Sequence, residues 1–339
     1  MLTTELVEHV LTTIPGRTVG VLGDLFLDRY LDIDPALNEP SVETGLTAYQ
    51  VTRVRSYPGA AGTVINNLAA LGVGRIYPLA FIGDDGEGYE LRQALRFLPG
   101  VEQGGIFPAP NRRTPTYTKP MLGKEELNRL DIKNRTPTEP GIQDHIIELL
   151  DEAWPQFDAL IVLDQVSERE CGVVTKRVRD HLTELAGREP EKFVLADSRE
   201  QIQLFRNVCL KPNEREIYGD LDHSLDGYDA ITPIFRRELV RKYTNPPAMF
   251  ITLGELGIEV VEADDNAHRI SAYRVAGPID ICGAGDSCSA GITSAMMAGL
   301  TYKQAAAFGN LVASITIQQL GVTGTATPEQ VRARWREVR

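Results

Sequence analysis

The sequence has 339 residues, of which 42% are hydrophobic and 24% are charged, as in an ordinary globular protein. Its 47 acidic residues outnumber its 35 basic residues, which gives a formal net charge of -12. This charge disfavours nonspecific binding to nucleic acid or to an anionic membrane, so we predict neither partner and expect a small polar substrate.

The first 17 residues predict an amphipathic helix and lack the basic start and apolar run of a signal peptide. No apolar run approaches the roughly 18 residues that a membrane span needs. The four cysteines and five histidines show no metal-ligand spacing. We therefore expect a reduced, cytoplasmic location and no structural zinc.

Short apolar runs alternate with helical periodicity along the chain. The runs predict buried parallel strands at 18–23, 75–83, 158–164, 192–197 and 248–254. Helical periodicity marks the stretches 61–71, 86–97, 169–186, 236–243, 286–298, 303–319 and 328–337. The alternation predicts an α/β fold with a mostly parallel sheet flanked by helices, in a single domain over 1–339.

Two segments, about 31–57 and 112–132, break this alternation. They contain threonine, tyrosine and valine beside turn residues and have no helical period. We expect short antiparallel strands outside the main sheet, which together form a small β-sheet lid.

The segment GPIDICGAGDSCSAG, residues 277–291, places a glycine turn and an acid where an apolar helix begins. The first amides of a helix lack partners on a preceding turn, and the helix dipole makes this end attractive to anions. Gly283 and Gly285 permit a close approach of the backbone. The alternative is an ordinary helix start that Asp286 caps.

Three other motifs do not fit this segment. A dinucleotide fingerprint needs its third glycine earlier than Gly291, and no P-loop lysine follows a glycine pair. A hydrolase using Ser287 would need its histidine from upstream, because none follows His268. Phosphoryl transfer does fit, since it needs amide donors for the phosphoryl charge and a base such as Asp286 for the attacking hydroxyl.

The segment DICGAGD (280–286) resembles the signature of the PfkB or ribokinase-like carbohydrate kinases. Three further stretches resemble that family in the same order: YPGAAGTVINNLAALG (57–72), KPNEREI (211–217) and ITLGELG (251–257). The resemblance implies a ribokinase-like three-layer fold with a small β-sheet lid, and a kinase that uses ATP and Mg²⁺. It also makes a monovalent cation and a homodimer through the lid expected features.

The resemblance assigns a role to each matching residue. Asp286 becomes the catalytic base, and the amides of Gly283, Ala284 and Gly285 form the anion hole. Asn213 and Glu216 help to place Mg²⁺ through water. The nucleotide contacts are Thr252, Gly254, Gly257 and Asn310, and the sugar contacts are Asp24, Gly59, Ala60 and Thr63.

Structural roles remain open for several of these residues. Asp24 and Asp164 could each cap the turn after a strand, and Asn213 with Glu216 could be a helix-start capping pair. Asp197 also ends an apolar run at the expected ligand edge.

Within the family, the sequence most resembles the heptose 7-phosphate kinase branch. This resemblance lies in three stretches: GDLFLDRY (23–30), TPTYTKPML (114–122) and ELNRLD (126–131). Residues 111–135 hold seven basic and three acidic side chains, which suits a substrate that already bears a phosphate. Arg129 is the expected phosphate or hydroxyl contact. The alternative is a solvated ribbon edge.

Three residues depart from the family pattern: Ala60, Thr63 and Cys282 replace a glycine, an asparagine and a threonine. They leave a second function open, a catalytically weak nucleotide or sugar sensor on the same fold.

Overall fold

The computed structural model describes residues 1–218, 233–263 and 266–339. Its main sheet has nine strands in the order β16-β15-β14-β13-β12-β11-β1-β6-β7. The strands from β14 to β7 are parallel, and β15 and β16 are antiparallel additions. They span Thr18–Gly23 (β1), Arg75–Gly83 (β6), Ile106–Ala109 (β7), Ala159–Asp164 (β11), Phe193–Ser198 (β12), Cys209–Leu210 (β13), Ala248–Thr252 (β14), Ile258–Glu262 (β15) and Ala267–Ile270 (β16). The five predicted strands are therefore confirmed.

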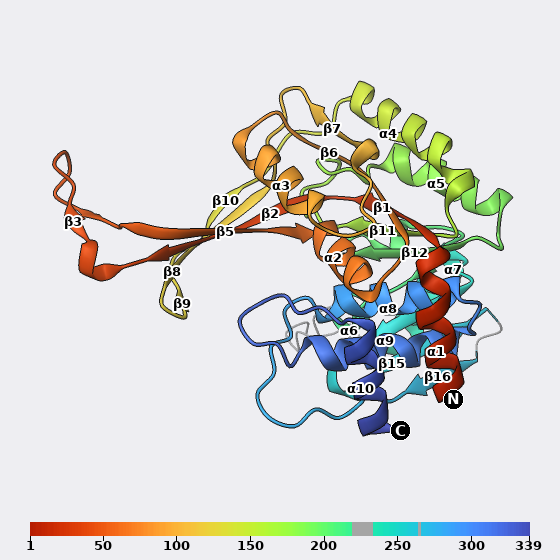
Figure 1. Cartoon of the computed structure of the whole chain (residues 1–339). Helices are drawn as coiled ribbons and strands as arrows, with labels where there is room; N and C mark the ends of the chain where they lie inside the picture. Colours follow the sequence, from red (N-terminus) through yellow and green to blue (C-terminus); the bar gives the residue numbers. More distant parts are fainter. Residues whose placement is uncertain (219–232, 264–265) are drawn as a thin grey trace, which may run out of the picture.

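Helices cover both faces of this sheet (Figure 1). On one face α2, α8 and α9 pack against the strands, with α1 and α10 outside them, and α4 and α5 lie on the other face. The helices span Thr4–Thr13 (α1), Ala61–Leu71 (α2), Gly86–Arg96 (α3), Pro140–Ala153 (α4), Lys176–Arg188 (α5), Glu214–Tyr218 (α6), Pro233–Thr244 (α7), Ala284–Met297 (α8), Tyr302–Thr316 (α9) and Pro328–Val338 (α10). Within the described residues, no helix has the length and apolarity to cross a membrane.

One predicted helix begins later than expected. The stretch from 169 was expected to be helical, but α5 begins only at Lys176. The side chain of Thr175 accepts the Val178 N–H and so caps the helix at that point.

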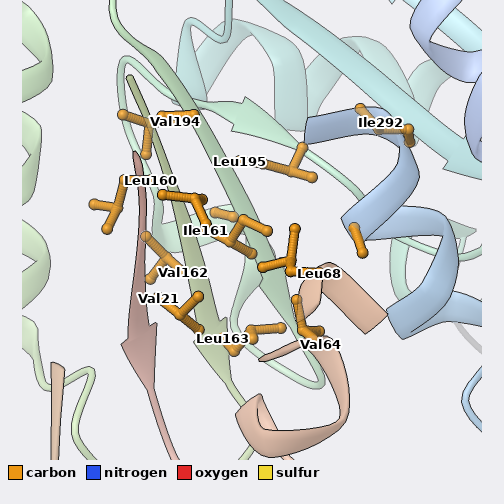
Figure 2. Packing of buried hydrophobic residues seen from close by; sticks show 14 of the residues in the cluster. Val21, Val64, Leu68, Leu160, Ile161, Val162, Leu163, Val194, Leu195 and Ile292 are labelled. Atoms are coloured by element: carbon orange, nitrogen blue, oxygen red, sulfur yellow. The ribbon is translucent and has the colours of Figure 1, made fainter. Parts of the chain in front are cut away.

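The hydrophobic core lies between the central strands and the helices α2 and α8 (Figure 2). All six residues of β11 are buried, because parallel strands in this position are covered on both faces. Val64 and Leu68 of α2 point toward these strands (Figure 2), and Ile292 of α8 faces α9, since a side-chain carbon at Gly309 would lie 2.8 Å from the Ile292 Cγ1. This packing fixes the start of α8 at the carboxyl edge of the sheet.

A second sheet projects from the main body; we call it the projecting sheet (Figure 1). Its strands are ordered β10-β8-β2-β5, and β9 pairs with β8. They span Leu25–Ile33 (β2), Val51–Ala60 (β5), Thr116–Leu122 (β8), Glu125–Glu126 (β9) and Leu130–Ile132 (β10). Beyond β2 and β5 the ribbon carries the short pair Glu39–Pro40 (β3) and Thr47–Ala48 (β4).

Two details predicted for this sheet were wrong. The first segment begins at residue 25, not 31, because its first three residues are apolar and buried against the main body. The strands are also not all antiparallel, since β2 pairs parallel with β8. Both strands enter from the carboxyl edge of the main sheet, after β1 and β7, and therefore run in the same direction.

Candidate active site

An open cavity of about 1310 Å³ lies at the carboxyl edge of the main sheet. Its walls come from segments far apart in the sequence: 211–216, 252–258, 272–281, 283–286 and 310–317. In parallel sheets this edge is where ligands bind, because the strand ends and the following loops converge there. The cavity is large enough for a nucleotide.

The turn that opens α8 forms one end of the cavity. Gly283 is its N-cap residue, with φ of 76°, a left-handed conformation that favours glycine. Asp280 holds this turn, because its carboxylate accepts the amides of Cys282 at 3.0 Å and Gly321 at 2.9 Å. The Ala284 N–H already donates to the Ile281 carbonyl at 3.1 Å. Of the three expected anion-hole amides, those of Gly283 and Gly285 therefore remain as the candidate donors.

Asp286, in the first turn of α8, faces this cavity. Burial raises the pKa of Asp286 to about 7, and the nearby Asp197 carboxylate adds to this rise. Lys211 and Arg199 act in the opposite direction. A carboxyl with a pKa near neutrality suits a general base, since it changes protonation state in the working range.

A buried ion pair lies beneath the glycine turn. The Lys211 Nζ is 2.8 Å from the Asp197 Oδ2, and the two side chains are only 5% and 10% exposed. Burial alone would lower the pKa of Lys211, but the Asp197 carboxylate raises it above the ordinary value. A side-chain carbon at Gly285 would lie 3.7 Å from the Lys211 Nζ. A fixed positive charge thus lies close to the candidate anion hole.

Asn213 and Glu216 cap the start of α6 by bonding to each other, as their spacing of three residues in the sequence allows. The Glu216 carboxylate accepts the Asn213 amide at 2.8 Å, and the Asn213 side chain accepts the Glu216 amide at 2.9 Å. Both residues also line the cavity. Burial raises the pKa of Glu216 to about 7, with Asp197 adding to the rise.

The residues expected at the nucleotide also line the cavity. Thr252 ends β14 and pairs with Asn213, while Gly254 begins the short turn that follows. Gly257 has φ of 96°, and a side-chain carbon there would come within 2.1 Å of the Ile270 carbonyl oxygen. Asn310 uses its side-chain N–H groups to hold the carbonyls of Ile270 and Ser271, at 3.0 and 3.2 Å.

Asp24 lies outside this cavity, and its contacts favour the structural role. It is 3% exposed, and its carboxylate accepts three backbone amides, from Gln165 at 2.9 Å, Val166 at 3.1 Å and Val173 at 2.7 Å. These donors fix the loop after β11. Three of the roughly four acceptor sites of this carboxylate are used in this way, and the role of Asp24 in binding sugar hydroxyls stays a prediction.

Asp28, in β2, is a further candidate site residue, which the sequence analysis did not single out. Its Oδ1 is 3.3 Å from the Lys119 Nζ, and its charge adds to the raised pKa of Asp286. Gly59 lies beside it, since a side-chain carbon there would come within 2.6 Å of the Asp28 Oδ2. The signal was the second acid of GDLFLDRY, four residues after Asp24.

The other two sugar-side residues lie at the start of α2. Ala60 has φ of 52° and is the N-cap of this helix, which explains why glycine is usual at this position. Thr63 is 6% exposed, and its Cγ2 would be 3.5 Å from a side-chain carbon at Gly283. The structure therefore brings α2 against the turn that opens α8.

The basic segment 111–135 is largely neutralised by protein partners. Arg129 is exposed, binds Asp131 through two hydrogen bonds of 2.7 and 2.9 Å, and lies over the Tyr117 ring. Other cations of the segment bind carboxylates or carbonyl groups: Arg112, Arg113, Lys119, Lys133 and Arg135. A preformed phosphate pocket is therefore not visible around Arg129.

Comparison with known proteins supports the family resemblance over part of the chain. Residues 193–330 match the model described as pfkB family carbohydrate kinase. The expected enzyme class, a kinase that acts on a sugar, agrees with the description of that model.

Relatives and solved structures match this chain over most of its length. A bifunctional protein HldE from Trichlorobacter lovleyi is 28% identical over 97% of this chain and 65% of its own length, and one from Geobacter metallireducens is 27% identical over 92% and 61%. The chain thus spans less than two thirds of the length of these relatives. A ribokinase from Arabidopsis thaliana, complexed with ribose and ATP, has a TM-score of 0.66 at 16% identity, covering 94% of this chain and 98% of that one. A putative sugar kinase from Clostridium perfringens has a TM-score of 0.69 at 16% identity, covering 95% and 96%. The ribokinase-like fold is confirmed.

Proposed function

We propose that the protein transfers the γ-phosphate of ATP to a hydroxyl group of a sugar or sugar phosphate, with Asp286 as the general base. One observation carries this proposal: a carboxyl with a raised pKa lies at a helix N-terminus beside a glycine turn and a buried lysine. The same cavity is lined by the residues expected at the nucleotide.

The arrangement divides the chemistry between the base and the amides. Asp286 accepts the proton of the sugar hydroxyl, whose oxygen forms the new bond to the γ-phosphorus while the bond to ADP breaks. The amides of Gly283 and Gly285, with the Lys211 ammonium, stabilise charge on the moving phosphoryl group. Asp28 and Lys119 are the candidates to bind and orient the sugar from the projecting sheet, which would act as a lid that excludes water.

Mg²⁺ fits the charges of this site. Among the described residues, no cluster of three histidine, cysteine, aspartate or glutamate side chains could hold a metal directly, which agrees with binding through water. Asp197 raises the pKa of both Glu216 and Asp286, so the site carries negative charge that a divalent cation would offset. Asn213 and Glu216 would hold the ion, and it would neutralise the phosphate oxygens.

The identity of the sugar is proposed from the relatives and from the sequence resemblance. The relatives named HldE match over nearly the whole chain, and together with the resemblance to heptose 7-phosphate kinases they favour a heptose 7-phosphate-like acceptor. The paired cations of segment 111–135 provide no independent phosphate site. A homodimer through the projecting sheet and a cytoplasmic location remain predictions.

An ATP-consumption screen over sugars and sugar phosphates, including heptose 7-phosphate, tests the function. We expect turnover with at least one acceptor, and the Asp286→Asn protein in the same screen shows whether a contaminating kinase produces the signal. ATP binding without turnover on any acceptor would favour the sensor function. A signal that persists with Asp286→Asn would remove Asp286 as the base.

The rate should depend on pH through Asp286. Because the pKa of Asp286 is raised to about 7 and only the ionised form accepts a proton, kcat/KM is expected to rise with pH, with a midpoint near 7. Steady-state rates between about pH 5.5 and 8.5 measure this. The pKa of Glu216 is also about 7, so the control is Glu216→Gln, which should keep the midpoint. A profile that becomes flat in Glu216→Gln would assign the titration to Glu216 instead.

A further inference from the structure

The C-terminal helix α10 reaches the wall of the cavity through one side chain, Arg334. Its Nε donates to the Ser314 hydroxyl at 3.1 Å, and its Nη2 donates to the Arg274 carbonyl. Ser314 lies on α9, and Arg274 lies in the segment that joins β16 to α8. Both line the cavity, so one guanidinium joins two of its walls.

Further hydrogen bonds hold the Arg334 side chain and the Ser314 hydroxyl in place. The Arg334 side chain is 12% exposed, and its Nη1 binds Glu337 on the same helix at 2.9 Å. The Ser314 hydroxyl donates to the Leu311 carbonyl at 2.7 Å, which leaves its oxygen free to accept from Arg334. Because a planar guanidinium presents its donors in a rigid fork, it sets the separation of its two acceptors.

The segment that Arg334 holds contains no helix or strand from 271 to 281. Asn310 fixes its beginning through the carbonyls of Ile270 and Ser271. Next along the chain, the Tyr273 ring packs edge-on against Trp335 of α10, with 6.3 Å between ring centres. An irregular wall segment needs such external contacts to keep one conformation, because it lacks the internal hydrogen bonds of a helix or a sheet.

The position of this wall indicates which part of a ligand it contacts. The phosphate end of the cavity is at the Gly283 turn, whereas Arg274 and Ser314 belong to the walls 272–281 and 310–317 beside Asn310. This side is the one expected to hold the base and ribose of the nucleotide. Arg334 donates its hydrogen bonds to Ser314, Arg274 and Glu337. None of these three is a residue expected to contact the sugar.

We infer that Arg334 is a positioning residue for the nucleotide: α10 uses it to hold the 271–275 wall against α9 and so sets the affinity for ATP. The inference rests on the proposed function, since it takes the ligand of this cavity to be a nucleotide. It concerns a residue outside the four motifs that resemble the family, and one that does not itself contact the reacting atoms.

The test compares Arg334→Gln with a matched control on the same helix. Arg332 lies two residues earlier and binds Glu8 of α1 through two contacts of 3.0 Å. Arg332→Gln therefore removes a similar pair that fastens α10 to the protein but does not contact the cavity. ATP with Mg²⁺ is titrated while tryptophan fluorescence is recorded, because Trp335 packs on the wall residue Tyr273.

We expect Arg334→Gln to raise the Kd for ATP by about tenfold, in line with two lost hydrogen bonds. Its KM for ATP should rise similarly, with kcat at saturating ATP and the KM for the sugar near wild type. Arg334→Lys, which keeps one donor, should lie in between. Arg332→Gln should lower the melting temperature but leave the Kd within about twofold.

Three results would count against the inference. Equal ATP affinity in Arg334→Gln and wild type would overturn it, as would an equal loss of affinity in both glutamine variants, because α10 would then act only through overall stability. If the wild-type protein itself showed no ATP binding, this result would contradict the proposed function, which takes the ligand to be a nucleotide. The inference about Arg334 rests on that function and would be contradicted as well.

Discussion

Replacing Asp286 with asparagine is expected to lower kcat by about 10³-fold with little change in the KM for ATP. General-base assistance contributes about 10²- to 10⁴-fold, and asparagine keeps the shape of the side chain while losing its proton affinity. Steady-state kinetics with a validated acceptor measures the loss. A kcat within about tenfold of wild type would contradict the assignment of Asp286 as the base.

The same substitution should stabilise the protein at high pH. The pKa of Asp286 is about 7 in the folded protein, above the ordinary value of 3.8, so the folded state binds more protons than the unfolded state between these values. Stability therefore falls as the pH rises through this window, and the cost is fully present above about pH 7. Asp286→Asn removes this cost, so its melting temperature should exceed that of wild type at pH 8 but not at pH 4. Asp280→Asn, which weakens the hold on the Cys282 and Gly321 amides, should instead lower the melting temperature at both values.

Replacing Lys211 with methionine is expected to lower the free energy of unfolding by about 3 to 5 kcal/mol. The substitution leaves the Asp197 carboxylate, only 10% exposed, without its partner in the protein interior, and breaking a buried pair in this way has a cost of that size. Urea unfolding monitored by tryptophan fluorescence measures it. The double variant Lys211→Met with Asp197→Asn should recover part of the loss, because the unpaired charge is gone.

A surface pair provides the matched control for this experiment. Lys176 and Asp180 form an ion pair whose side chains are 74% and 61% exposed. Lys176→Met should cost less than about 1 kcal/mol. A loss for Lys211→Met no larger than that for Lys176→Met would show that the interior pair is not what stabilises this region. Because Lys211 opposes the raised pKa of Asp286, the pH midpoint of any remaining activity should also move upward.

Local sequence patterns were sufficient to predict the elements of the main sheet and the glycine turn that opens α8. The apolar run at β11 predicts a strand buried on both faces, and all of its residues are buried. The turn at 283–285 predicts a helix start that faces a ligand, and α8 begins there beside the cavity. In both cases the signal lies within a few residues of the feature that it predicts.

The contacts that the local sequence did not predict are contacts between distant segments. Asp24 is satisfied by amides about 140 to 150 residues further along the chain, and nothing near it in the sequence indicates them. Lys211 occurs inside a recognised motif, but only the parallel pairing of β12 and β13 brings it to Asp197. The parallel pairing of β2 with β8 likewise follows from where each strand leaves the main sheet.

The projecting sheet is connected to the main body by four stretches of chain, after Gly23, before Ala61, after Ala109 and before Pro140. Any movement of this sheet relative to the main body therefore has to change the backbone at all four connections together. Exchange of this sheet between relatives would also require several segments to be transplanted together, because no single insertion contains it.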